Sequence, residues 1–170
     1  MPDAEADIPL VSSGPEQWAE TGRRLFSSGR YRHAKLCFKR AGQRLEHDIS
    51  HAYHLRQDAR LMEHGSKERK AIFIDAADIF WACAEELDAP HHLRCFTRSA
   101  ECYAEGDDPL RASESYYRAE KWTLAAGYAR KAAAFDRAIK IIREKDVDKA
   151  ISESIIQVCK VVYVQRNDME

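Results

Sequence analysis

The sequence lacks the features of membrane and secreted proteins. No stretch approaches the roughly 18 consecutive apolar residues that a transmembrane helix needs, and the N-terminus lacks a basic segment followed by an apolar run. The five cysteines are too scattered to form the disulfide framework of a small secreted domain, and they are typical of reduced, buried thiols. These absences predict an intracellular protein of the cytoplasm or nucleus, without a membrane partner.

Catalytic and cofactor signatures are also missing. The segments "GSKERK" and "GDDPLR" lack the second glycine and the Lys-Ser/Thr pair of a phosphate-binding loop. No serine, cysteine or histidine stands on a strand-to-helix elbow or in a glycine-rich turn that would expose a nucleophile. The sequence therefore predicts no catalytic residue, no cofactor and no enzyme activity for this chain.

Charged residues are abundant, but their signs balance. Lysine and arginine number 27 against 28 aspartate and glutamate, for a net charge of −1, so any electrostatic role must be local. A chain of 170 residues can bury one substantial core, and we expect a single domain over 15–170. Residues 1–14 mix proline, acidic and small residues without helical period, which predicts a disordered leader.

Proline and glycine predict where helices begin and end. Three prolines stand immediately before apolar-periodic runs, where a missing N–H costs nothing: Pro15, Pro90 and Pro109. Three glycines stand at the far ends of such runs, where a left-handed cap suits them: Gly29, Gly65 and Gly106. The predicted helices cover roughly 15–28, 31–41, 43–64, 67–88, 90–105, 109–119, 122–132, 135–145 and 147–166. The β-branched cluster at 158–164 is included as helix, so the predicted fold class is all-α.

Small residues recur along these predicted helices. Ala112, Ala125 and Ala138 are spaced 13 residues apart, which is one short helix plus a turn, and Ala34 begins a similar pattern. A small residue lets a neighbouring helix approach closely, and the larger residue one turn later fills the gap beside it. The spacing predicts a row of about eight or nine antiparallel helices, as in an α-solenoid or α-α superhelix.

The first predicted hairpin contains a spaced set of aromatic and small residues: Trp18, Gly22, Gly29, Tyr31, Ala34, Phe38 and Ala41. This set resembles a tetratricopeptide repeat, whose signature is W-x2-L-G-x2-Y, A-x3-F, A and P. Thr21, Leu25 and Glu46 depart from the usual Leu, Tyr and Pro. The resemblance implies that Gly22 lies where the two helices touch and that Gly29 makes the turn between them, while it leaves the role of Gly42 open.

A looser copy of this repeat follows later in the chain, with one extra residue expected in its turn. It runs through Cys95, Ser99, Gly106, Ala112, Tyr116 and Ala119. Four segments follow one another within residues 16–145, at 20–42, 52–60, 73–86 and 99–142. Their order further resembles the helical-repeat region of fungal TRANK-type proteins, which carry a UvrD-like superfamily 1 helicase domain elsewhere in a longer chain. This resemblance implies that the chain is a fragment of a helicase-related parent.

Two clusters have metal-ligand residue types. His47, His51, His54 and Asp58 form a stripe along one predicted helix, while Cys95 and Cys102 share one face of another. No Cys-x2-Cys pair is available for a four-ligand zinc site. We therefore interpret the histidines as a polar or partner-facing surface and the cysteines as core, and we predict no metal site.

Asp107 and Asp108 form an apparent pair of carboxylates just before Pro109. A carboxylate at a helix N-cap accepts hydrogen bonds from the first-turn amides and stabilises the helix by about 1 kcal/mol. Asp108 is therefore predicted to cap the helix that Pro109 begins, with no catalytic role.

The region from residue 23 to 44 contains eight basic residues and no acid. We call this set the basic patch: Arg23, Arg24, Arg30, Arg32, Lys35, Lys39, Arg40 and Arg44. It could bind an acidic partner or nucleic-acid phosphates. The interleaved aromatics Phe26, Tyr31 and Phe38 fall on repeat-core positions, which disfavours base stacking.

The leading functional hypothesis is a non-catalytic scaffold that binds a protein or peptide partner or another domain of its parent chain. The inner helix positions Ala19, Arg23 and Phe26, with Phe96, Ala100 and Tyr103 in the looser copy, favour a hydrophobic or helical partner over a carboxylate clamp. The last predicted helix is apolar on too many sides to be the solvent-facing end of a helical array. It is therefore expected either to be buried against the preceding helices or to continue into more chain or another molecule. The alternative is a nucleic-acid accessory module using the basic patch, which a salt titration of binding would distinguish.

Overall fold

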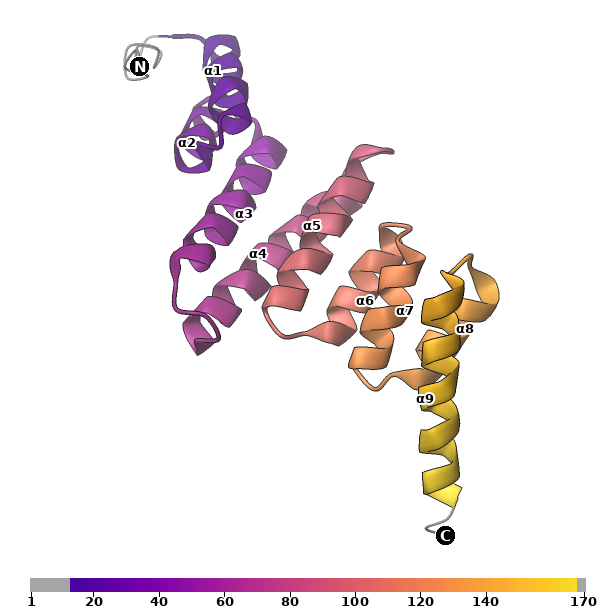
Figure 1. Ribbon diagram of the computed structural model, residues 1–170. Coiled ribbons are helices and arrows are strands. Elements are labelled where there is room, and N and C mark those ends of the chain that lie inside the picture. Colours follow the sequence, from indigo (N-terminus) through magenta and orange to yellow (C-terminus); the bar gives the residue numbers. More distant parts are fainter. Residues whose placement is uncertain (1–12, 168–170) are drawn as a thin grey trace. The chain divides into compact units, whose positions relative to one another are not determined.

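The computed structural model describes residues 13–167, and within that range the chain forms nine α-helices and no strand (Figure 1). The helices are α1 (Pro15–Ser27), α2 (Tyr31–Arg40), α3 (Arg44–Leu61), α4 (Lys67–Glu86), α5 (His91–Glu105), α6 (Pro109–Arg118), α7 (Trp122–Lys131), α8 (Phe135–Glu144) and α9 (Lys149–Asn167). The predicted all-α class is confirmed, including the helix over 158–164. Residues 1–12 of the predicted leader lie outside the described residues.

The chain divides into two compact units, one up to Cys83 and the other from Ala84 onward. The first unit contains α1 to α3 and most of α4, and the second contains α5 to α9. In both units helices pack against the next helix along the chain, which is the arrangement of an α-solenoid.

In the first unit, a close approach of α1 to α2 explains the glycine of the first motif. A Cβ atom placed on Gly22 would lie 2.8 Å from Cε1 of Phe38, which is too close for any side chain without movement of the ring. Phe38 packs there with Trp18, Leu25 and Cys37 in a small apolar core. The predicted packing role of Gly22 therefore agrees with the geometry.

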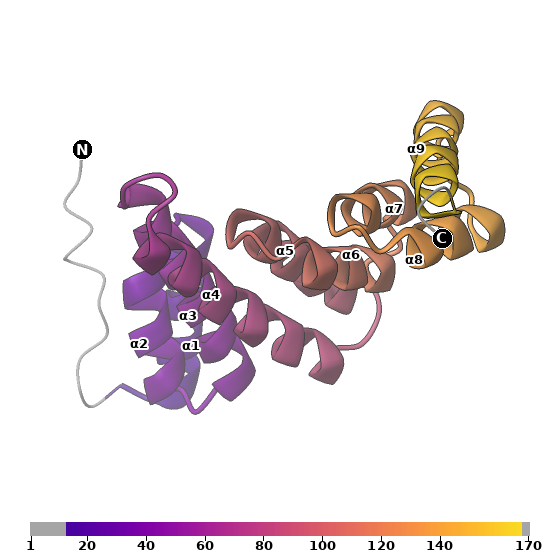
Figure 2. The same cartoon turned by 90° about the horizontal axis from the view of Figure 1, so that it is seen from below.

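The second unit stacks short helices through alanine. Ala112, Ala125 and Ala138, the three residues of the 13-residue spacing, are all fully buried. Helices α6, α7 and α8 each have ten residues, and each packs on its neighbour in the chain. Helix α9 lies against α7 and α8, as Figures 1 and 2 show, and Ile155 anchors it in their shared core.

One turn type joins the short helices. In five turns a backbone amide donates a hydrogen bond to the carbonyl of the residue five positions earlier, as Arg30 does to Leu25. The N–O distance in these bonds is 2.9 or 3.0 Å. The residue before that amide is left-handed, with φ of 56° to 77°. These left-handed residues are Gly29, Gly42, Asp107, Glu120 and Ala133. The open role of Gly42 is thus the turn between α2 and α3.

The expected turn of the looser repeat copy is wrong by one residue. Gly106 has an ordinary right-handed φ of −77°, and the left-handed residue is Asp107. Asp107 precedes Ala112 by the same five positions that separate Gly29 from Ala34, so this turn has no extra residue. Glycine was a misleading marker because the turn's hydrogen bonds fix which residue becomes left-handed.

Glu120 offers a test of the strain in these turns. A residue with a side chain is strained by roughly 1–2 kcal/mol in the left-handed region, and glycine removes this strain. Glycine also loses more conformational freedom on folding, which offsets part of the gain in stability. We expect Glu120→Gly to stabilise the protein by about 0.5–1 kcal/mol, and Glu120→Ala to leave its stability nearly unchanged. Urea unfolding followed by circular dichroism measures both variants, and a glycine variant no more stable than the alanine variant would contradict the expectation.

Candidate functional site: a groove beside the last helix

A hollow of about 340 Å³ lies between α8 and α9, and we call it the C-terminal groove. Phe135 and Ile139 come from successive turns of α8, while Ile156 and Tyr163 come from α9. Val162 and Cys159 complete the largely apolar lining. The groove exists because α9 contacts the array mainly through Ile155, so the flanking faces of α9 stay uncovered.

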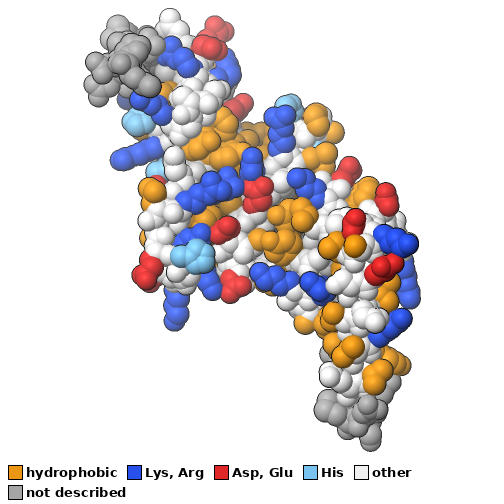
Figure 3. All heavy atoms as spheres, viewed as in Figure 1, with side chains coloured by type: hydrophobic (Ala, Val, Ile, Leu, Met, Phe, Trp, Pro, Cys, Tyr) orange, Lys and Arg blue, Asp and Glu red, His pale blue; other side chains and the backbone are white. Residues whose placement is uncertain are grey.

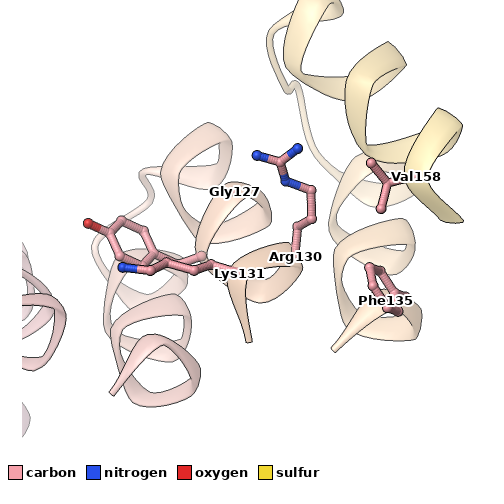
Figure 4. A pocket seen from close by; sticks show the side chains of 6 residues that line it. Gly127, Arg130, Lys131, Phe135 and Val158 are labelled. Atoms are coloured by element: carbon pink, nitrogen blue, oxygen red, sulfur yellow. The ribbon is translucent and has the colours of Figure 1, made fainter. Parts of the chain in front are cut away.

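A second hollow of about 360 Å³ shares Phe135 with the groove and lies beside α7. In Figure 4, Val158 of α9 points toward Phe135, and the Arg130 side chain extends from α7 toward α9. Arg130 Nη1 lies 3.4 Å from Ser154 Oγ on α9, a long hydrogen bond. The uncovered surface therefore continues on both sides of the Phe135 ring.

The C-terminal half of α9 keeps large apolar side chains in solvent. Val161, Tyr163 and Val164 are 53%, 68% and 56% exposed. Figure 3 shows hydrophobic side chains mixed with basic ones over this helix. Single exposed apolar residues are ordinary, but several on adjoining turns beside a groove are typical of an interaction surface.

Charge around these hollows is mostly positive. Arg143 and Lys160 line the groove and have no carboxylate partner among the described residues, and Arg130 and Lys131 line the second hollow. Asp136 is the only acidic residue of either lining. Burial, with a smaller contribution from Asp136, raises the pKa of the Cys159 thiol, so the groove holds no thiolate nucleophile at neutral pH.

Half of the basic patch is occupied by contacts within the first unit. Arg23 pairs with Glu20 at 2.9 Å, and Arg44 pairs with Asp48 at 3.3 Å. Arg40 lies over the Trp18 ring, 4.9 Å from its centroid. Arg24 is exposed and also has an interaction within the chain.

The other four basic residues have no carboxylate partner within residues 13–167. They are Arg30, Arg32, Lys35 and Lys39, at the start of α2 and along it. The nearby aromatics are used internally, because Tyr31 stacks on Tyr53 with ring centroids 4.8 Å apart and Phe26 meets both rings edge-on. The α2 surface thus offers cations for phosphates or carboxylates but few free rings for stacking bases.

The predicted inner partner surface is wrong at four of its six residues, while Arg23 is exposed and Phe26 is half-buried. Ala19, Phe96, Ala100 and Tyr103 are all buried, so they pack the helices together and cannot meet a partner. The sequence pattern identified apolar positions correctly but assigned them to a concave surface that the core occupies.

The histidine stripe lies half-buried on α3. His47 Nδ1 lies 2.8 Å from Asp48, and His54 Nδ1 lies 3.4 Å from Asp58. Burial, followed by the nearby Lys35, His47 and His54, lowers the pKa of His51. No three His, Cys, Asp or Glu side chains of the described part of the chain converge as metal ligands would.

The thiol cluster is part of the core, as predicted. Cys95 is 7% exposed and Cys102 is fully buried, and burial raises the pKa of Cys95 to about 11. The Cys95 thiol therefore stays protonated and unreactive at neutral pH.

Asp108 caps α6, as predicted. Its carboxylate accepts a 2.9 Å hydrogen bond from the Arg111 amide and a 2.7 Å bond from the Arg111 guanidinium. Partial burial alone would raise the pKa of Asp108, but these bonds lower it below its usual value. The carboxylate is therefore held ionised as a structural group.

Comparisons with family models, with curated proteins and with solved structures find no match to this chain. None of the helices in residues 13–167 is both long enough and apolar enough to cross a membrane.

Proposed function

We propose that this chain is a non-catalytic scaffold that binds a helical segment of a protein partner in the C-terminal groove. The single observation that supports this most is the exposed apolar surface of α9 next to a groove lined by α8. The second unit buries small alanine side chains between its helices, whereas the larger apolar side chains of Val161, Tyr163 and Val164 remain exposed to solvent. Burying such side chains against a partner gains about 25 cal/mol per Å² of apolar surface.

The sequence contained part of this signal. The broad apolar character of the last helix was visible in its Ile and Val residues. The α8 half of the groove was not, because Phe135 and Ile139 have the same spacing as core residues. Only the packing of α9 shows which side of α8 remains open.

A helical-peptide display selection against the folded protein tests this function. We expect enriched peptides to perturb backbone amide NMR signals of α8 and α9 and to leave α1 and α2 unchanged. Tyr163→Ser should weaken their binding by about tenfold, whereas Leu110→Ser, at a residue of α6 that is 50% exposed and lines neither hollow, should change it less than about twofold. A selection without enrichment, or binding that Tyr163→Ser leaves intact, would overturn the proposal.

Nucleic-acid binding through the basic patch is the second candidate. The four unpaired cations at Arg30, Arg32, Lys35 and Lys39 favour it, and the internal use of Phe26, Tyr31 and Tyr53 counts against base stacking. An affinity for single-stranded or duplex nucleic acid that falls steeply as salt rises would support this candidate.

The resemblance to TRANK-type repeat regions supports a further part of the proposal, that the partner is another domain of a helicase-related parent. The sequence of the full-length gene product tests it directly. Helicase motifs elsewhere in that sequence would support it, and their absence from a complete gene product would overturn it.

A further inference from the structure

We infer that the segment bound in the C-terminal groove is an amphipathic helix with acidic residues beside its apolar stripe. This inference rests on the proposed function and specifies the chemistry of its partner. Three features carry it: the length of the groove, the spacing of its apolar residues, and the sign of the charge at its edges.

The groove has the dimensions of two helical turns. On α8 its lining residues Phe135, Ile139 and Arg143 recur every four positions, and on α9 Ile156 and Tyr163 are seven positions apart. At 1.5 Å per residue these rows extend about 11–12 Å. A partner helix with apolar residues at i, i+4 and i+7 presents a stripe of that length, so it can place three side chains between the two rows.

The edges of the groove select the partner's charge. Arg143 on α8 and Lys160 on α9 border the same apolar lining, and neither has a carboxylate partner among residues 13–167. Arg130 and Lys131 extend the positive potential to the second hollow, where no acid lines the surface. Acidic residues flanking a bound helix would meet these cations, while basic residues would face like charge, which costs affinity.

The same charges disfavour a second copy of this chain as the occupant. Between residues 149 and 165, α9 carries two lysines, Lys149 and Lys160, and one acid, Glu153, so an α9 helix from another copy would bring more positive than negative charge to the groove. Like charges at close range oppose such an arrangement. An acidic partner helix has no such conflict, and only Asp136 in the lining would repel it.

Two synthetic helices test the inference on the full chain. Each is a fluorescein-labelled peptide of about 16 residues with leucine at i, i+4, i+7 and i+11, and the flanking positions are glutamate in one peptide and lysine in the other. Fluorescence anisotropy at low salt should show the glutamate peptide binding at least about tenfold more tightly than the lysine peptide. The preference should shrink as salt screens the charges.

Paired variants locate the effect in the groove. Lys160→Glu should weaken binding of the glutamate peptide by about fivefold or more and tighten binding of the lysine peptide. Lys140→Glu makes the same charge change on α8, but Lys140 lines a different hollow, with Glu114 and Glu144. We therefore expect less than about a twofold change for Lys140→Glu.

Several outcomes would overturn the inference. Equal affinity for the two peptides, or equal effects of the two charge variants, would mean that apolar contact alone selects the partner, and the scaffold function would stand. Neutral or basic peptides enriched by the display selection would lead to the same conclusion. Concentration-dependent dimerisation that Tyr163→Ser abolishes would make a second copy the occupant instead.

Discussion

Gly22→Leu is expected to unfold the α1–α2 hairpin, with a loss of at least about 3 kcal/mol in stability. A Cβ atom at this position already approaches Phe38 Cε1 to 2.8 Å and Cδ1 to 2.9 Å, so the longer leucine side chain has no space. Phe38 cannot move aside easily, because it is 3% exposed and packed among Trp18, Leu25 and Cys37. Overpacking of this kind costs 1–3 kcal/mol even where the core can partly adjust.

Gly127 provides the matched control. It also lies inside a helix, α7, but nothing lies within 4 Å of a Cβ placed on it. Alanine is favoured over glycine in a helix interior by about 1 kcal/mol. We therefore expect Gly127→Ala to stabilise the protein and Gly22→Ala to destabilise it, although the sequence change is the same.

Thermal unfolding and amide hydrogen exchange measure these effects. The exchange data should show lost protection in α1 and α2 for Gly22→Leu, with the second unit unaffected. Unchanged stability of Gly22→Leu would mean that α1 and α2 do not pack in the register described.

Ile155→Ala is expected to cost about 2–5 kcal/mol and to release α9 from α7 and α8. Ile155 is 1% exposed, and it packs with Ala125, Ala129 and Ile141 in the core of the second unit. Deleting a large buried aliphatic side chain loses its transfer free energy and leaves a cavity. The alanines around Ile155 are too short to fill that space.

Ile151, one turn earlier on α9, provides a control in which the same chemical change is made at a more exposed position. It is 40% exposed, so Ile151→Ala should cost less than about 1 kcal/mol. Urea unfolding compares the two variants, and peptide binding provides a second measurement. Ile155→Ala should abolish binding in the C-terminal groove because the groove needs α9 in place, and full binding by this variant would contradict the site.

The helices were predictable because their signals are local. Pro15 and Pro109 begin helices as predicted, and each end of the nine helices lies within three residues of its predicted position. The buried alanines were predictable because a strict 13-residue spacing matches the length of one short helix plus its turn. The left-handed turn residue Asp107 was not, since aspartate adopts that conformation less readily than glycine and Gly106 stands directly beside it.

The candidate site was only partly predictable, because it depends on which apolar faces remain uncovered. Phe96 and Tyr103 looked like partner-facing residues, yet they fill the space between helices. Phe135 opens a predicted helix and had no predicted contact with a partner, yet it lies in the groove. Sequence periodicity identifies the apolar faces of a helix, but the neighbour that covers each face is set by tertiary packing.

The uniform turns between the short helices also determine how such a chain can change in length. Because each turn repeats every 13 residues with the same hydrogen bonds, the loss or duplication of a whole block, such as 108–120, would rejoin equivalent positions. A single inserted residue would instead rotate every later side chain on that helix by about 100° and bring polar groups into the core. Related chains should therefore differ by whole blocks, with the helix that carries the binding surface displaced along the row by one position for each block.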